Sequence, residues 1–379
     1  MKLFNKDTRI WFSVLSLFLF FTSCQFDKKV KVKSKGVETK IIFDKPDSIV
    51  IKGEGGLIFD DIRNDRILLH NSVSKDVVTY HLKKGTTTVF NKFGNNYQEY
   101  TSLLRSISFY NDTTVVIGGK KGISLFSIEG NFIKYFPVER SKKTYAPIMH
   151  PIFLTDSLFI FYESLQGDPS IKNFYKGDTI ITVYHLNKGL IRRFAFFPEK
   201  ESDYNDPEYY YLYPFLFNIQ TIGDTLYLSS HNDLHIYKYQ ISNGNKLSVI
   251  NLQLHYYHPL KFKFYPKKKY GINDYIKFIA LNSTINRMYI SDRFIFLGYN
   301  KALTDEEIKS YSSYDDIRKK QCIYITTVKG EKLIDAVLPE RYGDFLFYRN
   351  DSLYFMARPT QESEDRNYTV IYKVKWNAE

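Results

Sequence analysis

A two-residue turn followed by a run of apolar residues occurs six times in this chain of 379 residues, and no other feature restricts its fold as strongly. In each turn Asn, Gly, Ser or Thr precedes Asp. The turns are Asn64-Asp65, Asn111-Asp112, Thr155-Asp156, Gly223-Asp224, Ser291-Asp292 and Asn350-Asp351. Residues of this kind favour the tight turns that join two antiparallel strands. The repetition predicts a protein built from several small sheets of one design.

Each copy extends to four predicted strands, which we call A to D. Strand A precedes the Asp turn, and strand B follows it. Strand C carries an aromatic residue at one fixed position. These aromatic residues are Tyr80, Phe126, Tyr184, Tyr237, Tyr324 and Tyr372. A glycine-containing turn and an apolar strand D follow in every copy except the last, which stops after strand C.

The missing strand has a counterpart near the start of the chain. Residues 35–43, KGVETKIIF, read as a strand that belongs to no copy of its own. Pairing this strand with the last copy closes a ring and removes an exposed sheet edge. The sequence therefore predicts an all-β fold, a six-bladed β-propeller of four-stranded antiparallel blades, with the N-terminal strand completing the last blade.

The aromatic content supports this fold. The chain contains 32 Tyr and 31 Phe, and sheets that pack face to face around an axis need large, flat side chains between them. The signatures of WD and kelch repeats are absent, which disfavours the intracellular scaffolds of those classes.

The N-terminus has the layout of a secretory signal. Basic residues precede an apolar run at 10–21, which is too short to span a bilayer. The sequence FTSC, which ends at Cys24, resembles a bacterial lipobox, in which the signal is cut before a Cys that receives lipid. The match departs at Phe21, where Leu is usual. The alternative is an ordinary secretory signal with an incidental Cys.

The lipobox resemblance implies three segments. Residues 1–23 are the predicted lipoprotein signal peptide, 24–34 a Lys-rich tether, and 35–379 the propeller. Acyl chains such as palmitate on Cys24 would hold the protein at a membrane. Because Gln25 rather than Asp follows the Cys, the resemblance implies the outer membrane, with display on either side left open. We expect a monomer without a cofactor.

The charge of the chain limits its partners. The formal net charge is +12, and about +10 remains once the signal peptide is removed. A basic exported protein can meet an anionic glycan, lipid head groups or an acidic protein face. No nucleic-acid partner is predicted, because the chain is exported and has no motif for one. A solvated surface with no dedicated partner is the alternative.

The predicted strand order places the long connections on one face. Because neighbouring strands are antiparallel, the A-to-B and C-to-D turns lie at one end of the ring and the B-to-C and D-to-A connections at the other. The second set contains the long segments 163–178, 199–213, 255–278, 299–321 and 357–368. Long loops gathered on a rigid scaffold commonly carry binding. We therefore predict that this long-loop face binds the partner.

Two adjacent loops of this face are rich in tyrosine and charge. Their candidate ligand-binding residues are Tyr209, Tyr210, Tyr211 and Tyr213 in an acidic loop, and Tyr256, Tyr257 and Lys261 in a basic one. Aromatic faces beside charged groups suit a sugar or a peptide. The alternative is that the two loops pair with each other and their Tyr side chains fill the loop core.

Strand A is the innermost strand of a propeller blade, so its first residues are predicted to line the channel mouth. The candidates there are Arg105, His150, Tyr213, Tyr342 and Asp344. Such a polar set could bind a substrate, or cleave it with Asp344 or His150 as acid or base. Hydrated polar groups without a role are the alternative. The sequence contains no nucleophile elbow, phosphate loop or calcium loop, so no catalytic residue is assigned.

The histidine pairs do not predict a metal site. His231 with His235, and His255 with His258, lack the third protein ligand that zinc sites generally need. Cys322 lies on a predicted strand C and is expected to be packed and unreactive. With lipid on Cys24, the mature chain has a single thiol and no internal disulfide.

These features together resemble the lipid-anchored six-bladed β-propeller lipoproteins of Bacteroidota-type bacteria, many of which belong to families of unknown function. The resemblance rests on the lipobox, the tether, hairpins of the GDTLYL or NDSLYF kind and first-strand closure. It implies a fold and an envelope location, and no active residue.

Three functions are consistent with the sequence. The leading hypothesis is a lipid-anchored envelope propeller that binds a glycan, a peptide or an envelope protein through its long-loop face. The second is a carbohydrate-active enzyme, a lyase or glycosidase, with a site at the channel mouth. The third is a structural repeat protein without a ligand.

Overall fold

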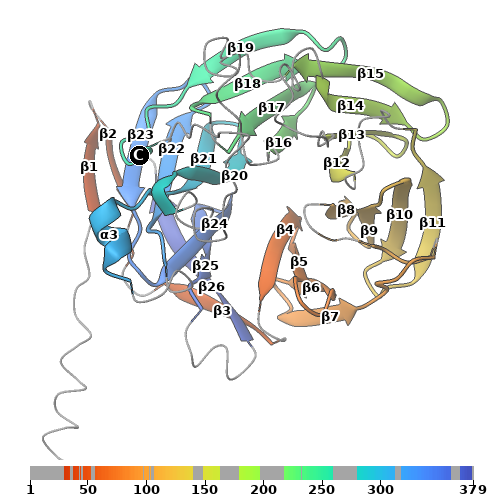
Figure 1. Ribbon diagram of the computed structural model, residues 1–379, viewed down its shortest axis with the longest axis horizontal. Helices are drawn as coiled ribbons and strands as arrows, with labels where there is room; N and C mark the ends of the chain where they lie inside the picture. Colours follow the sequence, from red (N-terminus) through yellow and green to blue (C-terminus); the bar gives the residue numbers. More distant parts are fainter. Residues whose placement is uncertain are drawn as a thin grey trace, which may run out of the picture.

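Six antiparallel sheets surround a central axis in the computed structural model, and the first strand of each sheet lies nearest that axis (Figure 1). The fold is the predicted six-bladed β-propeller. The structure describes residues 30–377 except 35–36, 42, 44–45, 53–55, 97, 102, 104–105, 140–147, 163–178, 197–216, 232, 259–279, 312–316 and 360–367.

Each blade contains consecutive strands in the order A to D. Blade 1 is β4 (Leu57–Arg63), β5 (Arg66–Asn71), β6 (Val77–His81) and β7 (Thr86–Phe90). Blade 2 is β8 (Ile107–Asn111), β9 (Thr114–Gly118), β10 (Gly122–Ser127) and β11 (Phe132–Pro137). Blade 3 is β12 (Met149–Phe153), β13 (Leu158–Tyr162), β14 (Thr179–His185) and β15 (Gly189–Phe196).

The second half of the ring follows the same order. Blade 4 is β16 (Phe217–Ile222), β17 (Thr225–Ser230), β18 (His235–Gln240) and β19 (Lys246–Asn251). Blade 5 is β20 (Thr284–Ile290), β21 (Phe294–Asn300), β22 (Gln321–Thr327) and β23 (Lys332–Val337), with helix α3 (Asp305–Lys309) between β21 and β22. Blade 6 is β24 (Tyr342–Arg349), β25 (Ser352–Ala357) and β26 (Tyr368–Asn377), completed by N-terminal strands.

The Asp turns join strands A and B in all six blades, as predicted. In blade 1 the turn residue Asn64 has φ +48°, and in blade 4 Gly223 has φ +54°. This left-handed backbone costs little for Asn or Gly and more for other residues. The backbone of the tight A-to-B connection therefore accounts for the Asn and Gly in the turns of blades 1 and 4, and Asn350 of blade 6, with φ +47°, is a third case.

Apolar side chains fill the space between neighbouring blades. The aromatic residue of strand C takes part: Phe126 is fully buried, and its ring stacks on Phe90 of the preceding blade with centroids 5.9 Å apart. Tyr324 is 1% exposed. The outermost strands are more open, and Leu247 of β19 is 52% exposed. The core thus lies in layers between the blades.

The ring is closed by N-terminal residues, but the main closing strand differs from the predicted one. The strand β3 (Asp47–Lys52) pairs with β26 from Tyr368 to Lys373. From the predicted segment 35–43, only Lys40 and Ile41 pair with β26, at Asn377 and Trp376. The reason is length: β26 has ten residues, so its edge takes β2 (Val37–Ile41) at one end and β3 along the rest.

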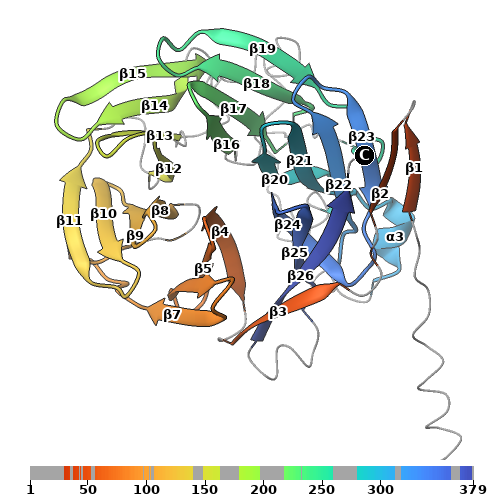
Figure 2. The same cartoon turned by 180° about the vertical axis from the view of Figure 1, so that it is seen from behind.

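The strand before β2 also belongs to the sheet. The strand β1 (Val30–Ser34) forms an antiparallel hairpin with β2, and both views of the fold place this hairpin beside β23 of blade 5 (Figure 1 and Figure 2). Residues Val30–Ser34 fall within the predicted tether 24–34, so this part of the tether is a strand. Residues 1–29 lie outside the described part of the chain.

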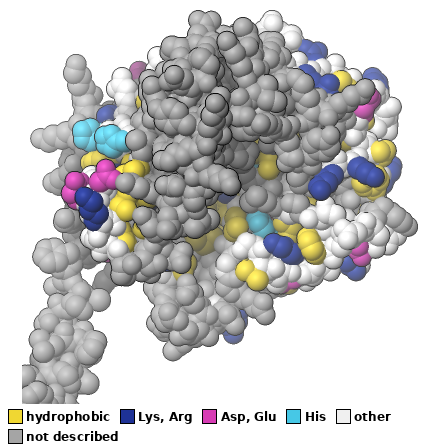
Figure 3. Space-filling view, viewed as in Figure 1, with side chains coloured by type: hydrophobic (Ala, Val, Ile, Leu, Met, Phe, Trp, Pro, Cys, Tyr) yellow, Lys and Arg dark blue, Asp and Glu magenta, His cyan; other side chains and the backbone are white. Residues whose placement is uncertain are grey.

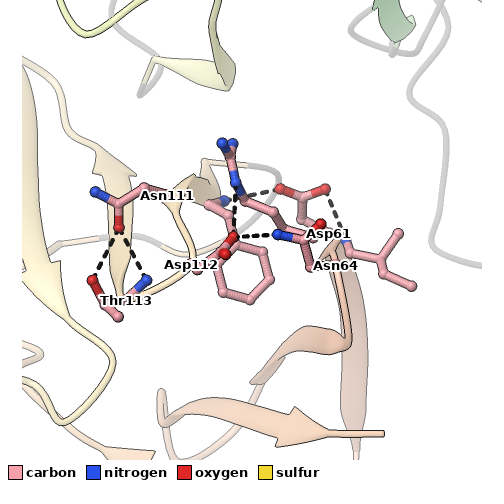
Figure 4. A network of polar contacts seen from close by, with 8 residues as sticks. Asp61, Asn64, Asn111, Asp112 and Thr113 are labelled. Carbon is pink, nitrogen blue, oxygen red and sulfur yellow. Dashed lines mark hydrogen bonds and ion pairs between the residues drawn. The ribbon is translucent and has the colours of Figure 1, made fainter.

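Polar contacts between the A-to-B turns link consecutive blades (Figure 4). Asp112 of blade 2 accepts a hydrogen bond from Asn64 Nδ2 at 2.7 Å and pairs with Arg63 Nε at 3.3 Å. Asp65 of blade 1 pairs with Arg349 of blade 6 at 2.8 Å. Each pair stabilises weakly, and together they connect the turns of three consecutive blades, 6, 1 and 2.

The closing strand gives a direct test of the ring. Ile51 of β3 is fully buried, whereas the adjacent Val50 is 51% exposed. We expect Ile51→Ala to lower the free energy of unfolding by about 3 kcal/mol, because it leaves a cavity in the core. Val50→Ala on the same strand should cost no more than about 1 kcal/mol. Denaturant unfolding followed by tryptophan fluorescence measures both, and equal costs would contradict this placement of β3.

Candidate functional site

The connections confirm the predicted difference between the two faces. On one face the strands are joined by short turns, such as the residues between β4 and β5 or between β22 and β23. On the other face the longest connections run from β13 to β14, from β15 to β16, from β19 to β20 and from β21 to β22. Figure 3 looks onto this long-loop face, where acidic and basic side chains stand together at the rim that carries α3.

Several predicted site residues lie outside the described part of the chain. They are Cys24, Arg105, Tyr209, Tyr210, Tyr211, Tyr213 and Lys261. Their proposed roles in lipidation and ligand binding therefore stay predictions.

The described tyrosines of the basic loop differ in exposure. Tyr257 is 5% exposed and donates a hydrogen bond from its hydroxyl to the carbonyl of His231 at 3.1 Å. Burial raises the pKa of this phenol, and the nearby Asp233 raises it further. Tyr256 is only partly buried. Tyr257 thus ties its loop to blade 4, while Tyr256 keeps surface that a ligand could contact.

The predicted channel-mouth residues do not form a single group. Tyr342 is fully buried, and its ring packs edge-on against Phe43 and Phe355 at centroid distances of 5.2 and 5.4 Å. His150 lies on β12 of blade 3, with its ring stacked on Tyr162 at 5.6 Å. Asp344 lies on β24 of blade 6 and is exposed. Blades 3 and 6 are on opposite sides of the ring (Figure 1), so His150 and Asp344 are not neighbours.

Asp344 is held by a chain of polar side chains at the long-loop end of blades 5 and 6. Asn286 of β20 donates from Nδ2 to Asp344 Oδ1 at 3.0 Å. Asn286 Oδ1 accepts from the Thr284 hydroxyl at 3.0 Å and from Asn300 Nδ2 at 3.4 Å. Asn300 Nδ2 also lies 3.3 Å from the Thr284 hydroxyl oxygen. We call Thr284, Asn286, Asn300 and Asp344 the blade 5–6 polar chain.

Beta-bulges place these polar residues on the inner strands. In β20 the register passes from Ile285 to Arg287, so Asn286 is the extra residue. In β24 it passes from Tyr342 to Phe345 and leaves Asp344 out of the ladder. A bulge frees a side chain from strict alternation and redirects it. Both partners of the Asn286–Asp344 hydrogen bond therefore come from bulges.

A buried acid–base pair lies on blade 1. Asp60 Oδ2 of β4 is 2.7 Å from His70 Nδ1 of β5, and the two side chains are 4% and 3% exposed. Asp60 is itself a bulge residue, since the register passes from Phe59 to Asp61. Burial raises the pKa of Asp60 to about 6, although His70 and Arg287 act in the opposite direction. This carboxyl can exchange a proton near neutral pH.

Two charged side chains connect blade 1 to other blades. Asp61 Oδ2 accepts the N–H of Phe109 in blade 2 at 2.9 Å, and burial raises the pKa of this carboxyl. Arg287 of blade 5 donates from Nη2 to the carbonyl of Phe59 at 2.7 Å. Since blade 6 separates blades 5 and 1 in the ring, Arg287 reaches past it on the inner side. We call Asp60, Asp61, His70 and Arg287 the central cluster. Through Asp61 it connects blade 1 to the adjacent blade 2, and through Arg287 to the non-adjacent blade 5.

The sequence held a signal for the central cluster that the prediction did not use. Strand A of blade 1 reads LIFDDI, with two carboxylates inside an otherwise apolar strand. Asp residues are rarely buried without a partner. The pair Asp60 and Asp61 therefore indicated that basic or hydrogen-bonding partners are buried beside this strand. The partner Arg287 could not be identified, because it is distant in the chain and belongs to a non-adjacent blade.

No metal site is found among the described residues, in which no group of three His, Cys, Asp or Glu side chains could hold an ion. Asp233 accepts from His235 Nδ1 at 2.5 Å and from the Tyr237 hydroxyl at 2.7 Å, which gives this histidine a structural role. Cys322 is fully buried, and burial raises the pKa of its thiol to about 12. The prediction that Cys322 is packed is confirmed.

No helix among the described residues is long and apolar enough to cross a bilayer.

Comparison with known proteins supports the fold. No family model and no curated protein matches the sequence. A member of the DUF4221 family from Bacteroides vulgatus is similar in structure, with a TM-score of 0.62 and 12% identity, over 92% of this chain and 100% of that one. A candidate exported protein from Bacteroides fragilis gives a TM-score of 0.55 and 13% identity, over 93% of this chain and 99% of that one. At these identities the likeness shows the fold alone.

The pKa of Asp60 predicts a pH-dependent stability. Because the folded state holds this proton more tightly than the unfolded chain, the stabilisation is complete below about pH 4 and is lost as the pH rises through about 6. Asp60→Asn keeps an oxygen acceptor for His70 but has no proton to lose. Relative to the unchanged protein, the variant should gain up to about 3 kcal/mol between about pH 4 and pH 7.

Chemical denaturation at several pH values measures this difference. The matched control is Asp292→Asn, which neutralises an exposed carboxylate in the turn between β20 and β21. A stability difference between the Asp60 variant and the unchanged protein that stays constant or falls with pH would refute the assignment. The control variant should show no trend of comparable size.

Proposed function

We propose that this protein is an exported envelope propeller that binds a glycan, a peptide or an envelope protein through its long-loop face. In this proposal residues 1–23 direct export, lipid on Cys24 holds the monomer at the outer membrane, and the ring displays its binding face. The candidate exported protein of Bacteroides fragilis supports the export step by structural similarity.

The observation that carries the proposal is the contrast between the two faces. The six A-to-B connections are short turns, and polar groups at those of blades 6, 1 and 2 bond to one another. The opposite face combines the long connections with polar side chains from inner-strand bulges, including Asp344 and Asn286. A rigid ring with long loops and pre-positioned polar groups on one face is a common arrangement in binding proteins.

The strand β23 offers matched positions for a test, because its two ends point to opposite faces. Glu340 follows β23 on the long-loop face, and Lys329 precedes β23 on the short-turn face; both are exposed. Each is replaced by Cys and coupled to a bulky maleimide polymer, while the buried Cys322 resists labelling. Binding is measured on arrays of polysaccharides and peptides and on isolated outer membranes.

We expect the label at position 340 to weaken binding by about tenfold or more, since it obstructs the binding face, and the label at position 329 to leave it within about twofold. Equal effects of the two labels, or a larger effect at position 329, would count against the proposed face. Absence of binding to all probes by the unlabelled protein would count against a binding function of this kind.

A further inference from the structure

Asp344 determines which groups donate and which accept along the hydrogen bonds of the blade 5–6 polar chain. The carboxylate of Asp344 can only accept hydrogen bonds, so Asn286 must turn its Nδ2 toward it. The oxygen of Asn286 then faces Thr284 and Asn300, and Asn300 must in turn present its own Nδ2. The amide orientations thus follow from chemistry and do not rest on assignment alone.

This order of donors and acceptors leaves one acceptor unused inside the chain and one at its surface. Asn300 Oδ1 is buried and has no hydrogen-bond partner. A buried acceptor without a donor costs free energy unless a water or a ligand supplies one. At the other end, Asp344 is exposed, and only its Oδ1 accepts from Asn286. Asp344 is therefore a fixed, solvent-facing acceptor supported by three side chains behind it.

The charges around the chain restrict what it can bind. Lys301 adjoins Asn300 in sequence, and Arg358 donates from Nε to the carbonyl of Tyr342, two residues before Asp344, at 3.3 Å. Lys319 donates from Nζ to the carbonyl of Asn282 at 2.6 Å. Arg358 and Lys319 are thus held at backbone carbonyls two residues before Asp344 and two residues before Thr284, so basic groups and a carboxylate lie along the same polar chain. A charged ligand of either sign would be repelled by one of them, which favours a ligand that is neutral and carries several hydroxyl groups.

We propose that the blade 5–6 polar chain is a subsite for a neutral sugar, whose hydroxyl groups donate to Asp344 and accept from the second amide hydrogen of Asn286. Hydroxyls suit this site because each can both donate and accept. Asn286 is a positioning residue, which acts through Asp344. This inference rests on the long-loop face being the binding face and names the ligand class for one part of it.

Close packing between the blades keeps the subsite in shape. A Cβ atom on Gly298 of β21 would lie 2.8 Å from the Cβ of Phe345 on β24, so the absence of a side chain lets β24 approach blade 5. Phe345 follows Asp344 directly, and Gly298 pairs with Arg287, which follows Asn286. The approach that this glycine allows brings the two bulges within hydrogen-bonding distance.

The test uses the mature protein and a panel of neutral, anionic and cationic oligosaccharides, with affinities measured by titration calorimetry. Asp344→Asn should weaken binding of a neutral oligosaccharide by about tenfold, because a charged acceptor is lost. Asp292→Asn, the same change on the short-turn face, should leave affinity within about twofold. Because Asp344 is exposed, neither variant should alter the melting temperature appreciably.

A double-mutant cycle tests the positioning role. Asn286→Ala alone should weaken binding, yet add little in the Asp344→Asn background, because the two residues act as one unit. The affinity should also change less than about twofold between about 50 and 500 mM NaCl, since a neutral ligand has no charge to screen.

Three outcomes would overturn the inference. These are an unchanged affinity in Asp344→Asn, full additivity with Asn286→Ala, or a strong preference for a charged oligosaccharide that weakens with salt. Binding that persists in Asp344→Asn but is blocked by the polymer at position 340 would refute the subsite and leave the binding face intact. Binding that no change on the long-loop face affects would refute both.

Discussion

Pairing between the two ends of the chain is the constraint on which the ring depends. The edge of β26 takes β3 through six residue pairs and β2 through two more. These pairs join residues that are more than 300 positions apart, so their loop-closure cost falls late in folding, after the five consecutive blades have local contacts. The last blade completes its sheet only when the first residues of the propeller arrive.

The segment between β2 and β3 adds side-chain contacts to this closure. Phe43 is 3% exposed and lies against Tyr342 and Phe355. Its carbonyl accepts hydrogen bonds from the Tyr342 hydroxyl and from Arg341. The burial of Tyr342 therefore serves ring closure, which explains why a residue at the predicted channel mouth has no surface left for a ligand.

Inside the ring, a second set of contacts holds blades that are not adjacent. Arg287 reaches from blade 5 to the carbonyls of Phe59 and Asp60 on blade 1, with its guanidinium carbon 4.8 Å from the centre of the Phe59 ring. A guanidinium satisfies several acceptors at once and stacks on an aromatic face. The β-ladder of β26 closes the ring at its outer edge, and Arg287 closes it near the axis.

Much of the fold could be predicted from the sequence because it depends on local residues. Turns such as Asn64-Asp65 reflect a backbone requirement within one blade, and the aromatic of strand C reflects a packing position that recurs from blade to blade. The choice between residues 35–43 and β3 could not be made, because both stretches contain a short apolar run, IIF in one and IVI in the other, and both pair with β26. Periodicity identifies a strand, but the length of its partner decides which segment pairs with it.

The candidate site was harder to predict because it is built on departures from alternation. Asp344 was identified from its place at the start of a strand A, but nothing local linked it to Asn286. Asn286, Asp344 and Asp60 are all bulge residues, and a bulge is a feature of register that a single strand does not reveal. Predicting the site would require knowing which inner strands contain a β-bulge, and at which residue.

These bulges also explain how a rigid ring can present polar side chains at its surface. A regular inner strand would direct its side chains into the layers between blades, where a polar group needs a buried hydrogen-bond partner. An extra residue allows one polar side chain to leave that layer while its neighbours stay in it, as Phe345 does beside Asp344. Exposed polar groups such as Asp344 can therefore be carried by the most firmly held strands of the ring, which position them without the help of a loop.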